Sequence, residues 1–450
     1  MSFGNLKLQF ASRPPLTRPI ICQGFEVRVI DPGLSQDEMT SAMSQEQQAE
    51  LEDARAKLIQ DLGCPNYFQH VNEHLPTAIE ACARATRVLN EVLNRLPDRN
   101  EFRESAAKVN INLAFLHADN GGLDLSKLAC QRVLALLADC SANTEPLPEC
   151  FQSLRFMAYD WLCKVCLATG EFPEALANFR IATNMRRELA ESQPSSRTQW
   201  IALAAQCLEF ILGSVLTTGR ALPEYEEVYQ RAIDALQRAK DIEPPPSKQE
   251  STNAALEMIT TFYGESFAMA FSVGASSGLP DDVTKLMAIT YCELALYYEN
   301  ASKLGEAANY FMLARSHFQE VYTSNPDDLD SQSRLAACLN HLGLLLLTSQ
   351  QYNFAEPCFV DALKLRDGLR KKVRNDIDND TYRAGTLCNL GTVAHKQTNY
   401  DVAAQRYRQA EKDLKRVLKQ APQHAVAKEF AQNVEMAQRA LTEDRGRTSL

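Results

Sequence analysis

From about residue 44 onward, hydrophobic positions recur at i, i+3 and i+4, and polar positions lie between them. This period of 3.6 residues is typical of amphipathic helices, and alternating runs of β-branched residues are nearly absent from the same region. Short clusters rich in Gly, Pro, Asn or Asp interrupt the pattern, for example at 119–122, 243–247 and 324–328. The pattern therefore predicts an all-α chain of helices joined by short connections.

The N-terminal 43 residues follow a different pattern. Residues 5–10 and 25–30 alternate apolar and polar side chains, which predicts two short strands. A two-stranded hairpin is only marginally stable by itself in water. The alternative interpretation of residues 1–43 is therefore an extended or disordered tail.

The helical region contains an internal repeat of about 48 residues. Each unit has a small residue in its first helix, a second small residue twelve positions later, an aromatic residue four positions further, and an alanine three beyond that. The three C-terminal units show this pattern best, with small residues Ala295, Gly343 and Gly391 and aromatics Phe311, Phe359 and Tyr407. Weaker units centre on Ala114, Cys163 and Gly213. Six units of one supersecondary type are therefore expected.

This spacing of small and aromatic residues resembles the tetratricopeptide repeat, and residues 352–369 resemble the long-helix repeats of kinesin light chains. The resemblance implies an all-α fold, an α-solenoid or superhelix of about six helical hairpins. The small residues are expected to let the two helices of a hairpin approach closely, and the aromatic to fill the gap to the neighbouring unit. The single apolar stripe of residues 422–441 predicts a C-terminal capping helix.

The spacing of the units also predicts how the chain is divided. Between Gly213 and Ala295 the spacing rises to 82 residues, which leaves room for an inserted helix and a hinge. The predicted segments are a tail (1–43), an N-terminal array (44–242), an inserted helix and hinge (243–280), a C-terminal array (281–421), and a capping helix with a tail (422–450).

Charge and cysteine content narrow the class of function. The net charge of −10 argues against a nucleic-acid partner or an anionic membrane surface, since both need a dense basic patch. No apolar run approaches the ~20 residues of a membrane span, and residues 1–25 contain no signal-peptide core. The thirteen cysteines lie mostly within apolar helical stretches, which favours reduced thiols. We expect a cytoplasmic protein without membrane insertion.

The search for catalytic chemistry finds only two weak signals. Cys163 and Cys166 form a C-x-x-C pair without a second ligand pair or a strand before it. His70 and His74 have the i, i+4 spacing of metal ligands but lack the H-E-x-x-H order. Phosphate-binding glycine loops are absent from the sequence. We therefore expect no enzyme, cofactor or metal, and keep a metal- or thiol-dependent enzyme as an alternative.

The tetratricopeptide resemblance also implies a binding groove, because in that family certain positions of the first helices contact an extended peptide. Asparagine suits these positions, since its amide offers a donor and an acceptor to a peptide backbone. Counting back from the leucine before each small residue gives Asn112, Trp161, Lys164, Asn340, His341, Asn389, Thr392 and His395, with Glu293 in the unit before.

The predicted function is a non-catalytic scaffold or adaptor that binds a peptide or helix of a protein partner in this groove. The alternative within binding proteins is a regulatory sensor. In that case residues 1–43 would occupy the groove until a ligand displaced them.

Overall fold

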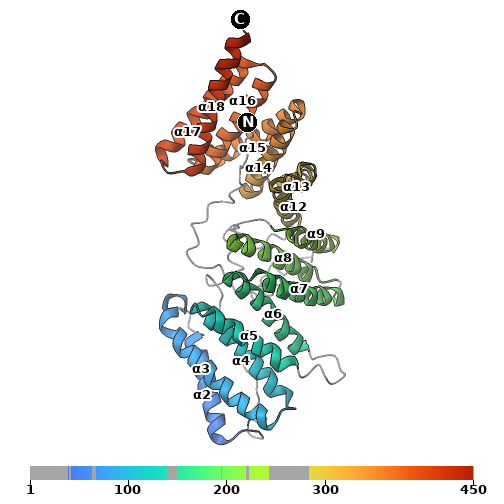
Figure 1. Ribbon diagram of the computed structural model, residues 1–450, viewed down its shortest axis with the longest axis vertical. Coiled ribbons are helices and arrows are strands. Elements are labelled where there is room, and N and C mark those ends of the chain that lie inside the picture. Colours follow the sequence, from blue (N-terminus) through green and yellow to red (C-terminus); the bar gives the residue numbers. More distant parts are fainter. Residues whose placement is uncertain are drawn as a thin grey trace. The chain divides into compact units, whose positions relative to one another are not determined.

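The computed structural model describes residue 39 and residues 42–62, 67–138, 149–193, 195–218, 222–242 and 283–448. Within these ranges every regular element is a helix, and none is a strand. The described residues fall into two compact units, one before Asp282 and one after it, which we call the N-terminal and the C-terminal unit (Figure 1). The predicted strands and the predicted inserted helix and hinge lie outside the described residues.

The N-terminal unit consists of helices that pack in consecutive pairs. The pairs are α2 (Gln45–Leu62) with α3 (Tyr67–Arg95), α4 (Asn100–Asp119) with α5 (Leu123–Ala138), α6 (Glu149–Thr169) with α7 (Phe172–Ser192), and α8 (Arg197–Thr218) with α9 (Tyr225–Asp241). Helix α3 continues through Pro76. We call the first helix of each pair its A helix and the second its B helix.

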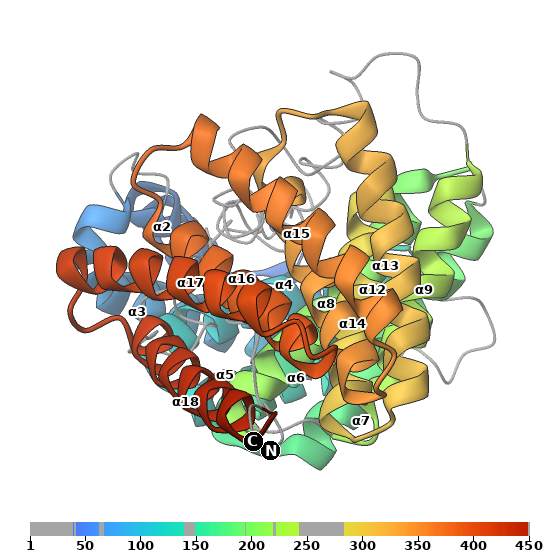
Figure 2. The same ribbon diagram turned by 90° about the horizontal axis from the view of Figure 1, so that it is seen from above.

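The C-terminal unit contains three further pairs and one additional helix. The pairs are α12 (Val283–Asn300) with α13 (Leu304–Ser324), α14 (Leu329–Thr348) with α15 (Tyr352–Lys372), and α16 (Ile377–Lys396) with α17 (Tyr400–Gln420). The final helix, α18 (Ala425–Thr448), packs on α17 and α16 (Figure 2). The all-α solenoid of hairpins with a capping helix is therefore confirmed. A seventh hairpin, α2–α3, precedes the six that the repeat pattern predicts.

The sequence sets the start of two A helices through the same capping residue. Asp328 precedes α14, and its side chain accepts a hydrogen bond from the backbone N–H of Ser331 at 3.0 Å. Asp376 precedes α16 and caps Asn379 in the same way at 2.9 Å. An aspartate at this position satisfies a backbone donor that the helix leaves unpaired.

In five of the described hairpins, the turn contains one residue with a left-handed backbone. In the N-terminal unit this residue is a glycine, Gly121 (φ 76°) or Gly170 (φ 80°). In the C-terminal unit it is Ser302 (φ 59°), Gln350 (φ 59°) or Thr398 (φ 62°). A left-handed backbone suits glycine and strains a β-branched residue such as threonine, so the two units differ in turn chemistry.

The contact between small and aromatic residues has the geometry that the repeat pattern predicts. A Cβ atom built on Gly343 would lie 2.7 Å from the ring of Phe359, and one on Gly391 would lie 2.5 Å from the ring of Tyr407. The Phe359 ring also packs with Leu390 of the following A helix. Glycine is therefore required at these positions because the aromatic ring of the B helix rests on the A-helix backbone.

The capping helix docks through a similar contact. A Cβ atom on Gly385 of α16 would lie 2.6 Å from the ring of Phe430 in α18. Phe430, Val434 and Leu441 are buried in one cluster with α16 and α17. The apolar stripe of α18 thus covers the last hairpin.

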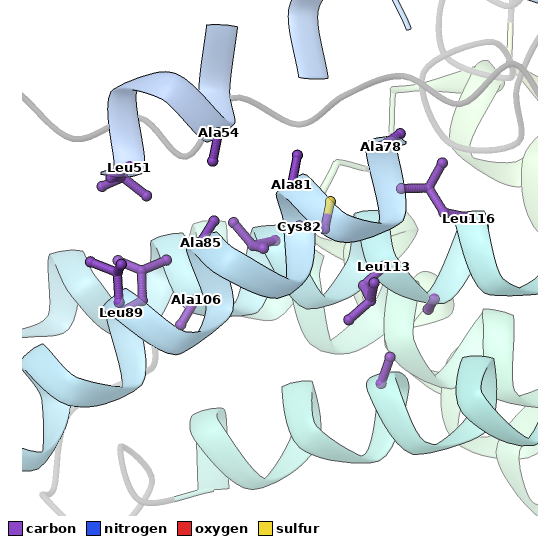
Figure 3. Close-up of a cluster of buried hydrophobic side chains, with 14 of the residues drawn as sticks. Leu51, Ala54, Ala78, Ala81, Cys82, Ala85, Leu89, Ala106, Leu113 and Leu116 are labelled. Carbon is purple, nitrogen blue, oxygen red and sulfur yellow. The ribbon is translucent and has the colours of Figure 1, made fainter. Parts of the chain in front are cut away.

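Alanine is the most frequent residue type in one core cluster of the N-terminal unit. Figure 3 shows Ala78, Ala81 and Ala85 of α3 between α2 and α4. Small side chains let neighbouring helices approach closely, so that hairpins stack on each other. Among the described helices, the stretch 197–215 of α8 is long and apolar enough to cross a bilayer. Because 71% of that stretch is buried within the chain, it equally fits a core helix.

Candidate partner-binding site

The predicted groove residues all lie on A helices. Asn112 is on α4, Trp161 and Lys164 are on α6, Asn340 and His341 are on α14, and Asn389, Thr392 and His395 are on α16. Only Asn340, Asn389 and His395 are half-buried, whereas the other five are buried. The structure therefore separates the predicted set into three half-buried and five buried side chains.

The structure brings Asn340 and Asn389 together. Asn389 Nδ2 donates a hydrogen bond to Asn340 Oδ1 over 3.1 Å and so joins two successive A helices. The hydroxyl of Thr386 lies 3.3 Å from the same oxygen. Within the described residues, Asn340 Nδ2 and Asn389 Oδ1 make no further hydrogen bond. One amide donor and one amide acceptor therefore remain unused at this point.

The two predicted histidines pair with carboxylates of neighbouring repeats. His341 Nδ1 lies 3.1 Å from Glu299 Oε2 of α12, and its ring stacks on Phe311 with centroids 5.3 Å apart. His395 Nε2 lies 3.2 Å from Asp444 Oδ2 of the capping helix. Both histidines thus connect one repeat to the next.

Thr392 forms part of the packing within its own hairpin. Its hydroxyl donates to the backbone oxygen of Cys388 at 3.0 Å and accepts from the Tyr407 hydroxyl at 3.3 Å. Burial raises the pKa of Tyr407 to about 12, so the phenol remains a donor at neutral pH. Thr392 therefore fixes the aromatic residue that rests on Gly391.

On the A helices of the N-terminal unit, the predicted residues are enclosed. Asn112 is fully buried. Trp161 donates from Nε1 to the Ser126 hydroxyl at 3.0 Å, and its ring meets that of Phe115 edge-on at 4.4 Å. The indole N–H of Trp161 is thus already hydrogen-bonded within the chain.

Lys164 belongs to a buried charge network between α6 and α8. Its Nζ lies 3.2 Å from a carboxylate oxygen of Asp160 and 3.2 Å from one of Glu209. Gln206 Nε2 donates to Asp160 Oδ1 at 2.6 Å, and Arg186 Nε donates to Gln206 Oε1 at 3.2 Å. Burial raises the pKa of Glu209, and the charge of Lys164 opposes that rise. The network holds two repeats together.

Glu293 is the remaining carboxyl group among the positions counted from the repeat. It is half-buried on α12 and occupies the same repeat position as His341 and Asn389. Burial raises its pKa to about 7, while the charge of Arg334 opposes the rise. Glu293 makes no ion pair with any described side chain. It is therefore poised to change charge near neutral pH.

The thiol of the C-x-x-C pair is not activated by its surroundings. Burial raises the pKa of Cys166 to about 11 and that of Cys163 well above its ordinary value, whereas a reactive thiol needs a lowered pKa. Cys166, Glu171 and Glu174 have ligand atoms within 4.8 Å of one another. However, Lys127 Nζ binds both carboxylates. A lysine thus supplies the positive charge that a metal would bring there.

The second metal hypothesis concerned His70 and His74. Both residues lie in helix α3, and their side chains fall outside the described residues. The tail 1–43, which the sensor alternative places in the groove, is described only at residue 39 and at residues 42 and 43. Both hypotheses stay predictions.

Counting positions along the repeat did not predict which side chains of neighbouring repeats bind the predicted groove residues. Glu209 on α8, Glu299 on α12 and Asp444 on the capping helix α18 each bind a predicted groove residue of a neighbouring repeat. These pairs are 42–49 residues apart in sequence, close to one repeat. Complementary polar residues one repeat apart were therefore a usable signal.

Helices in consecutive pairs, small–aromatic contacts in the C-terminal pairs and polar side chains along the A helices define an α-solenoid of helical hairpins, the architecture that the tetratricopeptide resemblance implies. No protein-family model matches the chain, and no curated protein sequence matches it. Its resemblances are to solved structures and concern the fold.

Three of these structures cover most of the chain. BtubC (BKLC) from P. vanneervenii is 13% identical, covers 78% of this chain and 93% of its own, and has a TM-score of 0.26. The apo form of RapI is 14% identical with coverages of 89% and 99% and a TM-score of 0.23. The TPR domain of P58(IPK) is 13% identical with coverages of 89% and 99% and a TM-score of 0.22.

Proposed function

We propose that this chain is a non-catalytic scaffold or adaptor that acts in the cytoplasm. It binds an extended peptide or a helix of a protein partner along the A helices of the C-terminal unit. The site centres on Asn340 and Asn389, with Thr386 beside them and Glu293 at the equivalent position of α12. Recognition is an equilibrium without covalent chemistry.

The observation that carries this proposal is the amide pair between α14 and α16. The two amides are half-buried and hold each other in place at 3.1 Å. Asn340 Nδ2 can donate to a peptide carbonyl, and Asn389 Oδ1 can accept from a peptide N–H, while their mutual bond stays intact. Such an arrangement recognises backbone and is ordered before the partner arrives, which lowers the entropy lost on binding.

The N-terminal unit is the less suitable place for the same task. Trp161 and Lys164 are buried, and their polar atoms already bind Ser126, Asp160 and Glu209. A partner would have to break those bonds first, and a buried charge without its partner is costly. The C-terminal amides require no such exchange.

The test uses the full chain and a displayed library of random twelve-residue peptides. Peptides selected on the wild-type chain are then measured against Asn340→Ala/Asn389→Ala. The matched control is Asn353→Ala/Gln397→Ala, because Gln397 Nε2 donates to Asn353 Oδ1 at 3.3 Å between the same two repeats, at exposed positions. We expect the first variant to bind at least tenfold more weakly and the control to bind as wild type. Equal binding by all three chains contradicts the proposal.

A further inference from the structure

Beyond its first turn, helix α17 has one partly exposed carboxylate, that of Glu411, which pairs with Lys415. From Gln405 to its end, the exposed residues of α17 are Gln405, Arg408, Gln409, Lys412, Lys415, Lys419 and Gln420. Arg408, Lys412, Lys415 and Lys419 follow at intervals of four, three and four residues, so they form one stripe along the helix. At 1.5 Å per residue this basic stripe is about 16 Å long.

Most of the charges in the basic stripe are unpaired. Lys415 Nζ binds Glu411 Oε1 at 2.5 Å. Arg408 donates from Nε to the backbone oxygen of Ala404. Neither Arg408, Lys412 nor Lys419 has a carboxylate within 4.0 Å among the described residues. Like charges three and four residues apart on a helix repel each other, so the basic stripe lowers the stability of α17.

Neither the repeat nor the helix dipole explains the basic stripe. One repeat earlier, on α15, the four equivalent positions hold Val360, Lys364, Asp367 and Lys371, and two repeats earlier, on α13, they hold Met312, Ser316, Gln319 and Thr323. Lys364 pairs with Asp361 at 2.9 Å. A helix C-terminus favours cations only within its last turn, which accounts for Lys419 but not for Arg408 or Lys412.

The charge around the basic stripe also differs from that of the whole protein. Residues 352–420 contain fourteen Lys and Arg against nine Asp and Glu, whereas the whole chain has a net charge of −10. At the adjoining helix ends, Arg370 of α15 and Arg416 of α17 both contact the same two carboxylates, Asp380 and Asp413. These carboxylates are nearly buried and hold the cations of two B helices close together. These two cations and two carboxylates balance each other, so the unbalanced positive charge of α17 lies on the residues of the basic stripe.

We propose that the basic stripe of α17 is a second docking surface, and that its occupant is an acidic, Asp- and Glu-rich segment of a protein partner. This proposal does not depend on the amide site between α14 and α16. Three lysines are point charges with flexible stems, which suit carboxylates presented on a mobile segment. The other exposed residues of this part of α17 are Gln405, Gln409 and Gln420, which offer hydrogen bonds rather than the apolar anchors of a membrane-binding helix. A nucleic acid would meet the field of a chain with net charge −10, whereas a short acidic segment brings far less negative charge.

The experiment measures fluorescence anisotropy of a labelled twelve-residue peptide with eight glutamates, titrated with the full chain. A peptide with glutamine in place of every glutamate is the neutral probe. The test variant is Lys412→Glu/Lys419→Glu. The matched control, Lys364→Glu/Lys396→Glu, changes the net charge equally at two exposed positions outside the stripe. Circular dichroism checks that both variants keep their helices, and Lys412→Gln/Lys419→Gln provides a milder version.

We expect the acidic peptide to bind, the neutral one not to bind, and affinity to fall as salt rises from 50 to 200 mM. The test variant should bind at least tenfold more weakly, the glutamine variant by an intermediate factor, and the control within twofold of wild type. Asn340→Ala/Asn389→Ala should retain the acidic peptide. Equal losses in the test and control variants would overturn the proposal, because net charge alone would then explain binding. Binding of anionic vesicles or duplex DNA without binding of the acidic peptide would also overturn it.

Discussion

The N-terminal and C-terminal units place a buried arginine at the same repeat position and surround it differently. Arg186 on α7 and Arg366 on α15 each follow the aromatic residue of their B helix by seven positions, and both are buried. Other repeats hold Leu137, Leu236, Phe318 and Leu414 at this position. The repeat therefore does not require arginine here, and the neighbours decide what the charge does.

Arg186 belongs to a network that contains carboxylates. It donates to Gln206, which in turn donates to Asp160, and its guanidinium lies 4.4 Å from the centre of the Phe156 ring. Burial raises the pKa of Glu209, and the charge of Arg186 helps that of Lys164 to oppose the rise. In the N-terminal unit the buried charge is thus balanced by others.

Arg366 is surrounded by neutral groups. Its Nη1 donates to the Ser333 hydroxyl at 3.1 Å and to Asn379 Oδ1 at 3.4 Å, and its guanidinium lies 5.2 Å from the centre of the Tyr382 ring. No described carboxylate lies within 4.0 Å of it. Burial lowers its pKa to about 10. The same repeat position thus holds an arginine in a network with carboxylates in one unit and an arginine among neutral groups in the other. The free energy needed to bury the charge differs between the two cases.

The largest expected effect tests this contrast directly. Arg186→Leu should lower the free energy of unfolding by about 3 kcal/mol, because it removes one member of a buried charge network. Arg366→Leu should leave it unchanged or raise it by about 1 kcal/mol, because leucine is accommodated at this position in three other repeats. Urea denaturation of both variants provides the measurement. A similar loss of unfolding free energy in the two variants would contradict the difference proposed between the two arginines.

The next effect concerns the glycines of the A helices. Gly391→Ala should cost about 2 kcal/mol, because the new Cβ would lie 2.5 Å from the Tyr407 ring. Gly213→Ala should be neutral or stabilise by up to about 1 kcal/mol, because its Cβ would meet only the tip of Leu167 at 3.2 Å. Thermal unfolding followed by circular dichroism compares the pair. A stable Gly391→Ala chain would contradict the role of the small–aromatic contact.

A smaller effect depends on pH. The folded-state pKa of Glu293 is raised to about 7 from an ordinary 4.5, so its ionisation disfavours folding above pH 7, and this penalty disappears as pH falls toward 4.5. Glu293→Gln should therefore stabilise the chain by about 1–2 kcal/mol at pH 8 and have little effect at pH 4.5. Unfolding free energies measured across this range test the sign.

The counterpart in the N-terminal unit is Glu209→Gln. Burial raises the pKa of Glu209 too, so its ionisation also carries a penalty at pH 8, but its carboxylate pairs with Lys164. This change should therefore stabilise the chain less than Glu293→Gln does at pH 8, because it leaves Lys164 with Asp160 as its carboxylate partner in the network. Equal stabilisation by the two substitutions would show that the two carboxyl groups are equivalent.

The smallest effect concerns the hairpin turns. Thr398→Gly should stabilise by up to about 1 kcal/mol, because threonine is strained at a φ of 62°. Gly170→Thr should destabilise by about 1 kcal/mol for the same reason. Denaturation midpoints of the two variants should move in opposite directions.

The fold could be predicted where the contacting residues of a hairpin are separated by a fixed number of positions in the sequence. Gly343 and Phe359 lie sixteen positions apart, and the same spacing recurs for Gly391 and Tyr407, so the hairpins could be located. The α2–α3 hairpin was missed because it packs through alanines such as Ala78 and Ala81 and lacks this signature. Small residues alone do not distinguish a hairpin from any other helical core.

The candidate site was less predictable, because position along an A helix does not reveal what the next helix offers. Counting positions along the repeat predicted both Asn340 and Lys164 as groove residues. The structure leaves an amide group unused at Asn340 and surrounds Lys164 with Asp160 and Glu209. Exposure of a repeat position is thus set by its neighbour one repeat away.

The polar contacts between successive repeats have a mechanical consequence. The hydrogen bonds and ion pairs of Asn340, His341 and His395 with neighbouring repeats join positions 42–49 residues apart, so each links a repeat to its immediate neighbour. When such a molecule is pulled at its ends, the force passes through one repeat after another. Under a pulling force the C-terminal unit should release α18 first, once His395–Asp444 and Arg445–Asp401 part, and then yield hairpin by hairpin. A peptide bound to both α14 and α16 would then join two successive hairpins and raise the force needed to separate them.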